Sequence, residues 1–340
     1  MGEGIHGMRL LILGGTKFLG RYLVEAGLER GHELTLLHRG QTNPDLFPNV
    51  EKIHANRDGK LDVLNGRQWD AVIDTSGYVP RVVKQAVEKL KDAVSHYTFV
   101  SSISVYRDFT TLGLAEDAPK LELEDVFSED IEHSYGALKA LCESEVQAVF
   151  GERALVVRPG LIVGPHDPTD RFTYWSHRFA KGGDVLVPSD KFASLQFIDV
   201  RDLAAWILTM VERRVSGVFN ATGPGAPLTM AQFMAACVDV SAKDANPVWV
   251  SEEFLLRHKV GEWVELPLWI SKQTNWPGFM AASNQKAMAT GLTFRPLAQT
   301  IFDTMEWGLN FPTDRPWKAG LSRERERQLL TAWSEEAPSS

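Results

Sequence analysis

The chain has 340 residues, of which 44% are apolar and 24% are charged, and its formal net charge is -8. This composition is that of an ordinary globular protein, and the length suits one large domain or two smaller ones. The acidic balance argues against a nucleic-acid partner, and the presence of only two cysteines argues against a disulfide framework and suits a reducing compartment.

Short β-rich runs alternate with helical stretches over the first half of the chain, which is typical of a parallel sheet covered by helices. The expected strands are 8–13, 33–38, 50–54, 70–74, 97–101 and 154–158, and the expected helices are 18–30, 81–94 and 134–149. After about residue 165 the segments become irregular and rich in Gly, Pro and Trp, except that 196–222 predicts one more helix and strand of the first sheet.

We therefore expect an α/β fold with two parts. The first is a Rossmann-type, doubly wound parallel sheet that binds the nucleotide, formed by residues 8–165 plus 196–222. The second is a smaller C-terminal substrate-binding lobe, formed by residues 166–195 plus 223–335.

A glycine-rich turn follows the first expected strand and opens the first expected helix. Glycines permit a tight turn and a close approach of the backbone to a pyrophosphate, while the helix N-terminus supplies N–H groups and a favourable dipole. The strand–turn–helix context therefore predicts nucleotide binding, against the alternative of a purely structural turn. The predicted contacts are Gly14, Gly15, Thr16, Lys17, Phe18, Leu19 and Gly20. Lys17 could lie along the pyrophosphate or reach solvent.

The end of the second expected strand distinguishes NAD from NADP. A carboxylate at this point binds the 2′-hydroxyl of the adenine ribose, whereas an arginine accommodates a 2′-phosphate. The sequence has Arg39 after His38 and no acid. This favours NADP(H), although stacking of Arg39 on adenine would leave NAD(H) open.

Tyr135 and Lys139 lie four residues apart in an expected helix, so their side chains share one face. A nearby ammonium lowers the pKa of a phenol, which would let Tyr135 exchange a proton near neutral pH. Ser102 follows the fifth expected strand, at the sheet edge where ligands of open α/β sheets bind. We expect Ser102 to bond the substrate oxygen that Tyr135 protonates. For the Tyr–Lys pair alone, a surface position is the alternative.

In this order, the turn, the serine and the Tyr–Lys pair resemble the extended short-chain dehydrogenase/reductase family, also called the NAD-dependent epimerase/dehydratase family. The resemblance runs from Met8 to about Thr222 and includes the segments 158–165 and 197–204. It implies that Ser102, Tyr135 and Lys139 are catalytic. It also implies cofactor contacts by Asn56, Ser76, Gly77, Tyr135, Lys139, Pro159 and Gly160.

The two residues directly after Ser102 narrow the reaction type. Sugar-nucleotide dehydratases of this family carry an Asp-Glu pair there, whereas this chain has Ile103 and Ser104. Without a carboxyl group to protonate a leaving hydroxyl, dehydration is disfavoured. We expect net oxidation or reduction of a secondary alcohol or ketone of a small polar molecule, with epimerisation of a sugar or sugar-nucleotide through a transient ketone as the alternative.

Contacts to the substrate are expected from Tyr78, Arg171 and Trp175, with packing of a lid as the alternative for the last two. We expect no metal site, because the histidines and aspartates between residues 166 and 177 lie in a loop without fixed geometry.

Two functions of another class compete with catalysis. The segments 14–20 and 36–40 also resemble chloroplast stem-loop-binding proteins, which use this fold on RNA, but the acidic stretch 116–132 before Tyr135 would repel phosphates. The second competing function is that of a regulator that senses NADP without turnover, and the complete Ser–Tyr–Lys set argues against it.

No apolar run spans a membrane and residues 1–7 carry no basic leader, so we expect a cytoplasmic protein, with a homodimer as an open option.

Overall fold

The computed structural model describes residues 7–312 and 315–336, which divide into two compact units. Unit 1 comprises the described residues up to Leu161 together with Val200–Gly223 and Ala282–Thr293. Unit 2 comprises Ile162–Asp199, Pro224–Ala281 and the described residues from Phe294 onward. Residues 1–6, on which most of the expectation about a leader rests, lie outside the described residues.

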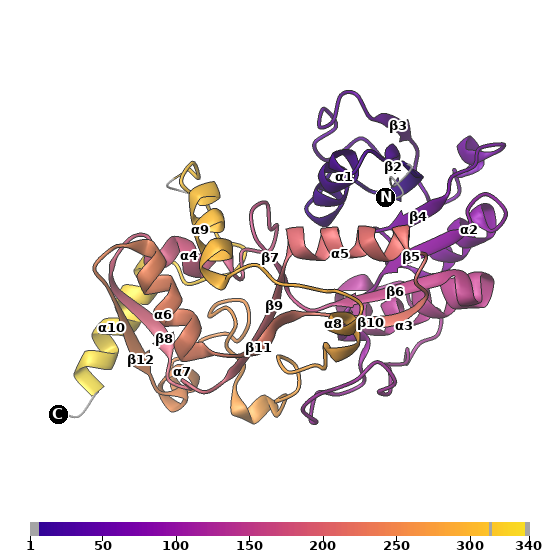
Figure 1. Ribbon diagram of the computed structural model, residues 1–340. Helices are drawn as coiled ribbons and strands as arrows, with labels where there is room; N and C mark the ends of the chain where they lie inside the picture. The colour runs from indigo at the N-terminus through magenta and orange to yellow at the C-terminus, as the bar shows by residue number, and fades with distance from the viewer. Residues whose placement is uncertain (1–6, 313–314, 337–340) are drawn as a thin grey trace. The chain divides into compact units, whose positions relative to one another are not determined.

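A seven-stranded parallel sheet forms the centre of unit 1, in the order β10-β6-β5-β4-β1-β2-β3 (Figure 1). Its strands are β1 (Arg9–Leu13), β2 (Glu33–His38), β3 (Glu51–His54), β4 (Ala71–Asp74), β5 (His96–Val100), β6 (Ala154–Pro159) and β10 (Gly217–Ala221). The strand order reverses between β1 and β4, and this is the point at which doubly wound sheets bind ligands beyond their carboxyl ends. The predicted Rossmann-type fold is confirmed.

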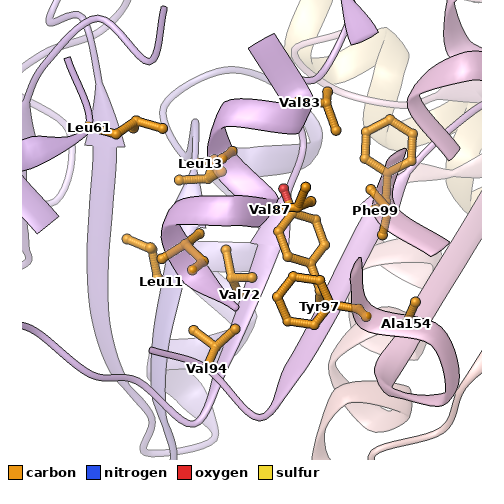
Figure 2. Close-up of a cluster of buried hydrophobic side chains, with 14 of the residues drawn as sticks. Leu11, Leu13, Leu61, Val72, Val83, Val87, Val94, Tyr97, Phe99 and Ala154 are labelled. Atoms are coloured by element: carbon orange, nitrogen blue, oxygen red, sulfur yellow. The ribbon is translucent and has the colours of Figure 1, made fainter. Parts of the chain in front are cut away.

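Helices cover both faces of this sheet. They are α1 (Leu19–Glu29), α2 (Pro80–Leu90), α3 (Ile131–Phe150), α5 (Val200–Glu212) and α8 (Gln285–Ala289), with short 3-10 turns η1 (Asp62–Leu64), η2 (Ile103–Val105) and η3 (Gly151–Arg153). Helix α1 packs with α5, and α2 packs with α3. Figure 2 shows the apolar cluster between the sheet and the α2 side, where Leu11 and Leu13 of β1 meet Val83 and Val87 of α2.

Residues of β1 are apolar without alternation because both faces of the strand are covered. Leu10 and Ile12 are as fully buried as Leu11 and Leu13, although successive side chains of a strand point to opposite faces. A continuous apolar run is what a central parallel strand requires. None of the helices described in the structure combines the length and the apolar character needed to cross a membrane.

Unit 2 holds two small sheets, of order β11-β9-β7 and β12-β8. Its strands are β7 (Ile162–Val163), β8 (Gly183–Pro188), β9 (Ser194–Asp199), β11 (Gly223–Thr229) and β12 (Ala245–Val250). Its helices are α4 (Thr173–Phe179), α6 (Met230–Ser241), α7 (Glu252–Arg257), η4 (Lys272–Thr274), α9 (Leu297–Gly308) and α10 (Arg323–Glu336). Three phenylalanine rings, those of Phe172, Phe197 and Phe233, contact one another in its core.

The segment Ala282–Thr293 differs from the domain expectation, which placed it in the substrate lobe. It belongs to unit 1, where the Lys286 ammonium donates to the Val218 carbonyl at 2.7 Å and the Asn220 amide donates to the Ser283 carbonyl at 3.1 Å. Helix α8 has only five residues, too few for a helical apolar period to be visible in the sequence.

Candidate active site

The turn between β1 and α1 has a geometry that requires glycine. Gly14 and Gly15 have φ values of 116° and 106°, which residues with side chains rarely adopt. A Cβ atom on Gly20 would lie 2.7 Å from the backbone nitrogen of Gly15, so the helix packs this closely only without one. The first turn of α1 carries no acidic residue. These features fit a pyrophosphate at the N-terminus of α1.

Side chains of the same turn lie in different surroundings. Thr16 and Leu19 are buried, whereas Lys17 is exposed. The Asn43 side-chain amide donates to the Thr16 carbonyl at 3.0 Å and so ties the loop after β2 to the turn. Phe18 has a φ of 40°, an unusual value for a residue with a side chain. Exposure of Lys17 is compatible with both roles considered for it.

The carboxyl ends of β2 and β3 form a histidine-containing edge next to this turn. The Gly40 N–H donates to His38 Nδ1 at 2.9 Å, and the rings of His38 and His54 lie 5.0 Å apart. Burial lowers the pKa of His38, and the positive charges of His54 and Lys52 lower it further. Arg39 is exposed at the end of the strand. The end of β2 thus carries a histidine and an arginine and no acid.

Asn56, a predicted cofactor contact, is exposed after β3, and its side-chain carbonyl accepts from the Asp58 N–H at 3.1 Å. The next residue has a role that the sequence did not suggest. The Arg57 guanidinium donates to both carboxylate oxygens of Asp74, at 2.6 and 2.8 Å, and to Ser76 Oγ at 3.1 Å. Asp74 is completely buried at the end of β4, and Tyr97 donates to it at 2.7 Å.

This ion pair determines the charge state of Asp74. Burial alone raises the pKa of the carboxyl group, but the Arg57 charge and the hydrogen bonds more than offset it, so the pKa is lowered. The pair contacts Ser76, which the resemblance assigns, with Gly77, to the cofactor. Ser76 Oγ also donates to the Leu13 carbonyl at 3.1 Å, which links the ends of β1 and β4.

Lys139 is only 2% exposed on α3, and its ammonium has two carbonyl partners. It donates to Gly77 O at 2.6 Å and to Val100 O at 2.7 Å, and it lies 4.3 Å from the centre of the Phe99 ring. Burial lowers the pKa of Lys139 to about 8. The lysine therefore joins the carboxyl ends of β4 and β5 to α3, and two of the three ammonium protons are already used.

Ser102 lies beside Tyr135, and its hydroxyl affects the titration of the phenol. Burial raises the pKa of Tyr135 to about 12, the neighbouring Tyr78 adds to the rise, and the Ser102 hydroxyl lowers it in part. This differs from the expectation that Lys139 lowers the pKa of the phenol. The reason is that the Lys139 ammonium donates to backbone carbonyls and not to the phenol.

Gly136 brings helix α3 onto the turn η2 that follows Ser102. Ser102 caps η2 with its own side chain, which accepts from the Ser104 N–H at 3.0 Å. A Cβ atom on Gly136 would lie 2.1 Å from the carbonyl oxygen of Ser104, a contact that no real Cβ makes. The absence of a side chain directly after Tyr135 is therefore what allows α3 to approach η2.

A second buried ion pair lies one helical turn after Lys139, on the same face of α3. Glu143 accepts from Arg158 at 2.8 and 2.7 Å and from Ser101 Oγ at 2.6 Å, while Arg158 also donates to the Tyr106 hydroxyl at 3.0 Å. Glu143 and Arg158 are 0% and 3% exposed. Burial raises the pKa of Glu143, but its bonds to Arg158 more than offset this and the pKa is lowered. The network joins α3, β6 and the residue before Ser102.

Pro159 and Gly160 lie at the carboxyl end of β6, beside β10. The Gly160 N–H donates to the Ala221 carbonyl at 3.2 Å. A Cβ atom on Gly160 would lie 2.3 Å from the Thr222 hydroxyl oxygen, so the glycine permits a close approach of the two chain segments. Both residues stand at the carboxyl edge of the sheet, as the resemblance requires.

The three predicted substrate contacts differ in their surroundings. Tyr78 is 43% exposed in unit 1, and its ring centroid lies 6.5 Å from that of Tyr135. Arg171 is partly buried in unit 2, with its guanidinium 5.5 Å from the centre of the Trp263 ring. Trp175 is 0% exposed, and its indole N–H donates to the Pro267 carbonyl at 3.0 Å. The position of Trp175 is that of a core residue and does not support a direct substrate contact.

Three residues of unit 1 became recognisable only in the structure: Arg57, Gly136 and Glu143. Glu143 stands one helical turn after Lys139, a spacing that could have drawn attention to it. Arg57 and Asp74 carried no such signal. Within residues 7–312 and 315–336, no group of three or more His, Cys, Asp or Glu side chains could hold a metal ion.

Residues 10–222 match the model of a protein family described as the NAD dependent epimerase/dehydratase family. A chloroplast stem-loop binding protein of 41 kDa b from Arabidopsis thaliana is 28% identical over 235 residues, which are 63% of this chain and 58% of that protein. The matched part thus spans less than two thirds of that relative. The epimerase family protein SDR39U1 from Bos taurus is 26% identical over 246 residues, which cover 67% of this chain and 79% of the relative.

Solved structures share the fold at low sequence identity. The UDP-N-acetylglucosamine 4-epimerase from Bacillus cereus superposes with a TM-score of 0.67 at 17% identity, covering 92% of this chain and 100% of that one. The Bordetella bronchiseptica enzyme WbmH in complex with NAD+ superposes with a TM-score of 0.68 at 16% identity, covering 90% of this chain and 99% of that one.

Proposed function

Because the chain belongs to the NAD dependent epimerase/dehydratase family, we propose that it is an NAD(P)-dependent oxidoreductase that interconverts a secondary alcohol and a ketone of a small polar substrate. The observation that carries the proposal is that Tyr135, one helical turn before Lys139, lies beside Ser102, because Gly136 packs directly on the turn that Ser102 caps. These groups lie at the carboxyl edge of the sheet, where ligands of such folds bind.

The groups of the chain have separate tasks in this proposal. The nicotinamide, when bound, supplies or accepts the hydride. Tyr135 has a pKa near 12, so its phenol is protonated at neutral pH and can donate a proton to a carbonyl oxygen as that oxygen becomes an alcohol. Ser102 hydrogen-bonds the same oxygen and orients it. Lys139 holds Gly77 and Val100 in place and has one remaining proton for a ribose hydroxyl.

The cofactor in this proposal is NADP(H). Arg39 follows β2, the last residue of the strand is His38, and neither is an acid that would bind a 2′-hydroxyl and repel a 2′-phosphate. Structural relatives were solved with NAD, so NAD(H) is the alternative that a binding measurement must test. The fit of the glycine turn to a pyrophosphate is the same for both cofactors.

Epimerisation is the second candidate, because several proteins with this fold are named as epimerases of UDP-sugars. An epimerase retains its reduced cofactor and returns the hydride to the other face, whereas a reductase releases its cofactor in every cycle. The missing ribose-binding carboxylate removes one cofactor anchor and favours release. Net oxidation or reduction is therefore our first choice.

RNA binding is a third candidate function, because the chain resembles chloroplast stem-loop-binding proteins and a protein of that name from Arabidopsis thaliana is among its relatives. Against it stand the net charge of -8 and the acidic stretch before Tyr135. The expected cytoplasmic location and the homodimer stay predictions.

The proposal is tested by mass spectrometry of the ligand released from purified protein, followed by incubation of a panel of ketones with NADPH labelled at C4. Exchangeable NADP and label in the product support a reductase. Tightly held NAD together with inversion of a sugar substrate and no net cofactor consumption would show an epimerase instead. Protein that binds neither dinucleotide but retains structured RNA would contradict both.

A further inference from the structure

Tyr78 is an exposed aromatic residue beside the proposed proton donor. The residue is 43% exposed, its ring centroid lies 6.5 Å from that of Tyr135, and the Lys139 ammonium lies 5.3 Å from the ring centre. In the described part of the chain, its hydroxyl has no hydrogen-bond partner. An accessible phenol with an unused hydroxyl is available to a ligand, and it brings an apolar face and a polar tip together.

The backbone before Tyr78 is fixed, so the position of its ring is not arbitrary. Gly77 lies in a tight place, because a Cβ atom there would be 2.6 Å from the Phe99 ring and 2.8 Å from a Val83 methyl group. The Gly77 carbonyl accepts from Lys139 at 2.6 Å, and helix α2 begins two residues after Tyr78, at Pro80. The catalytic lysine therefore anchors the segment that carries Tyr78.

The hydroxyl of Tyr78 is a donor throughout the neutral pH range. Burial and the negative charge of Asp74 raise the pKa of Tyr78, so the phenol keeps its proton. Ser102 and Tyr135 already form a pair that is suited to one reacting oxygen. A carbonyl oxygen has two lone pairs, and these two donors satisfy them. A third hydroxyl at the same site calls for a second oxygen on the ligand.

We propose that Tyr78 binds a second substrate oxygen, carried by the carbon next to the reacting one, so that the preferred substrates are α-hydroxycarbonyl compounds and the corresponding vicinal diols. This inference rests on the proposed function, since Ser102 and Tyr135 must bind the reacting oxygen. A hydrogen bond spans about 2.7 Å, and two phenols whose rings are 6.5 Å apart can therefore reach oxygens on adjacent carbons.

The first experiment measures binding without turnover. Butan-2-ol and butane-2,3-diol share a carbon skeleton and differ by one hydroxyl, and neither can react while the protein is saturated with a reduced cofactor. NADPH, or NADH if it binds more tightly, is used at saturation, and the affinity of each alcohol is measured by saturation-transfer NMR. We expect the wild type to bind the diol about tenfold more tightly than it binds the alcohol. The Tyr78→Phe variant should bind the two compounds about equally, because the hydrogen bond to the second hydroxyl is lost.

The second experiment measures turnover of the matching ketones, butanone and acetoin, by NADPH oxidation. Tyr78→Phe should lower kcat/KM for acetoin about tenfold and leave that for butanone within about twofold. The control is Tyr174→Phe, which removes the hydroxyl of a buried tyrosine in unit 2 and should change kcat/KM for neither acetoin nor butanone. The Phe variants retain the ring, so packing is preserved.

Each outcome separates this inference from the proposed function. Equal binding of diol and alcohol to the wild type would overturn the inference. If Tyr78→Phe lowers kcat/KM for butanone and for acetoin by the same factor and also weakens cofactor binding, Tyr78 contacts the cofactor, and this result would overturn the inference as well. A preference for the diol that depends on Tyr78, with no turnover of any ketone, would support the second-oxygen contact and contradict the oxidoreductase function.

Discussion

The two ends of the carboxyl edge of the main sheet in unit 1 are built differently. At the end formed by β4, β5, β6 and α3, which we call the catalytic end after the proposed function, the charged residues are buried and paired, and Asp74 and Glu143 are both 0% exposed. At the end formed by β2 and β3, which we call the adenosine end after the proposed cofactor site, Arg39 and Asn56 are exposed and His38 is partly buried. If the proposed function holds, the catalytic geometry is therefore tied to the folding of the core, whereas cofactor choice depends on surface side chains.

This difference predicts how substitutions behave. A change at the catalytic end that breaks a buried pair should damage stability as well as turnover, because an unpaired charge remains in the core. A change at the adenosine end should alter cofactor affinity alone. Four single variants and one change of pH test the contrast, in order of decreasing expected effect.

Removal of the Tyr135 hydroxyl should have the largest effect. In Tyr135→Phe the ring still packs, but the proton donor is lost, so we expect kcat/KM to fall by about 10²–10⁴-fold with nearly unchanged cofactor affinity. Activity is measured by NADPH oxidation with a reactive ketone, and cofactor binding by fluorescence titration. Residual activity within about tenfold of the wild type would contradict the role of Tyr135.

Breaking the Glu143–Arg158 pair should reduce the free energy of unfolding. Arg158→Met leaves the buried Glu143 carboxylate with the Lys120 ammonium, at 3.3 Å, as its remaining charged partner, and loss of one partner of a buried pair costs about 3–5 kcal/mol. Urea unfolding of the wild type and the variant measures the cost. The double variant Arg158→Met with Glu143→Leu is the control, since it removes both charges and should recover much of the loss. A single variant as stable as the wild type would show that the pair does not fix α3.

Acid should destabilise the protein through the same buried carboxylates. The pKa values of Asp74 and Glu143 are lowered in the folded state, so their stabilisation is complete above the unfolded-state values and is lost as the pH falls through the folded-state values. Below about pH 4, each such group should lower the unfolding free energy by up to ~1.4 kcal/mol for every unit by which the pH falls. Urea unfolding between pH 7 and pH 3 measures the slope.

Asp74→Asn provides the comparison, because an amide does not titrate. Its unfolding free energy should be lower at pH 7 and should depend less steeply on pH in the acid range. Equal slopes for the wild type and this variant would mean that Asp74 does not contribute to acid denaturation.

The smallest expected effect is that of Arg39→Ala. Loss of one exposed guanidinium should weaken NADPH binding about fivefold, since an exposed ion pair contributes up to about 1 kcal/mol. NADH binding and the melting temperature should stay nearly unchanged. Equal losses of affinity for NADPH and NADH would mean that Arg39 stacks on adenine. A fall in melting temperature would show that the two ends of the sheet edge do not differ as described.

Much of the fold could be predicted because its signals are local. Continuous apolar runs, the glycine turn and the helix with Tyr135 and Lys139 each depend on neighbouring residues, and β2 and β6 begin at the residues expected for them. The least predictable part was α8, whose place beside β10 is fixed by contacts to Val218 and Asn220 that are 63 residues or more distant in sequence.

The sequence by itself determined the Rossmann-type sheet, the nucleotide-binding turn and the presence of Ser102, Tyr135 and Lys139, because spacing within one strand or helix fixes which residues share a face. Only the tertiary structure decided which atoms these residues meet. The pairing of Arg57 with Asp74, the contact that requires Gly136, and the direction in which Lys139 donates arise between elements that are distant in the chain. The raised pKa of Tyr135 has the same origin, since burial depends on all the elements packed around a group.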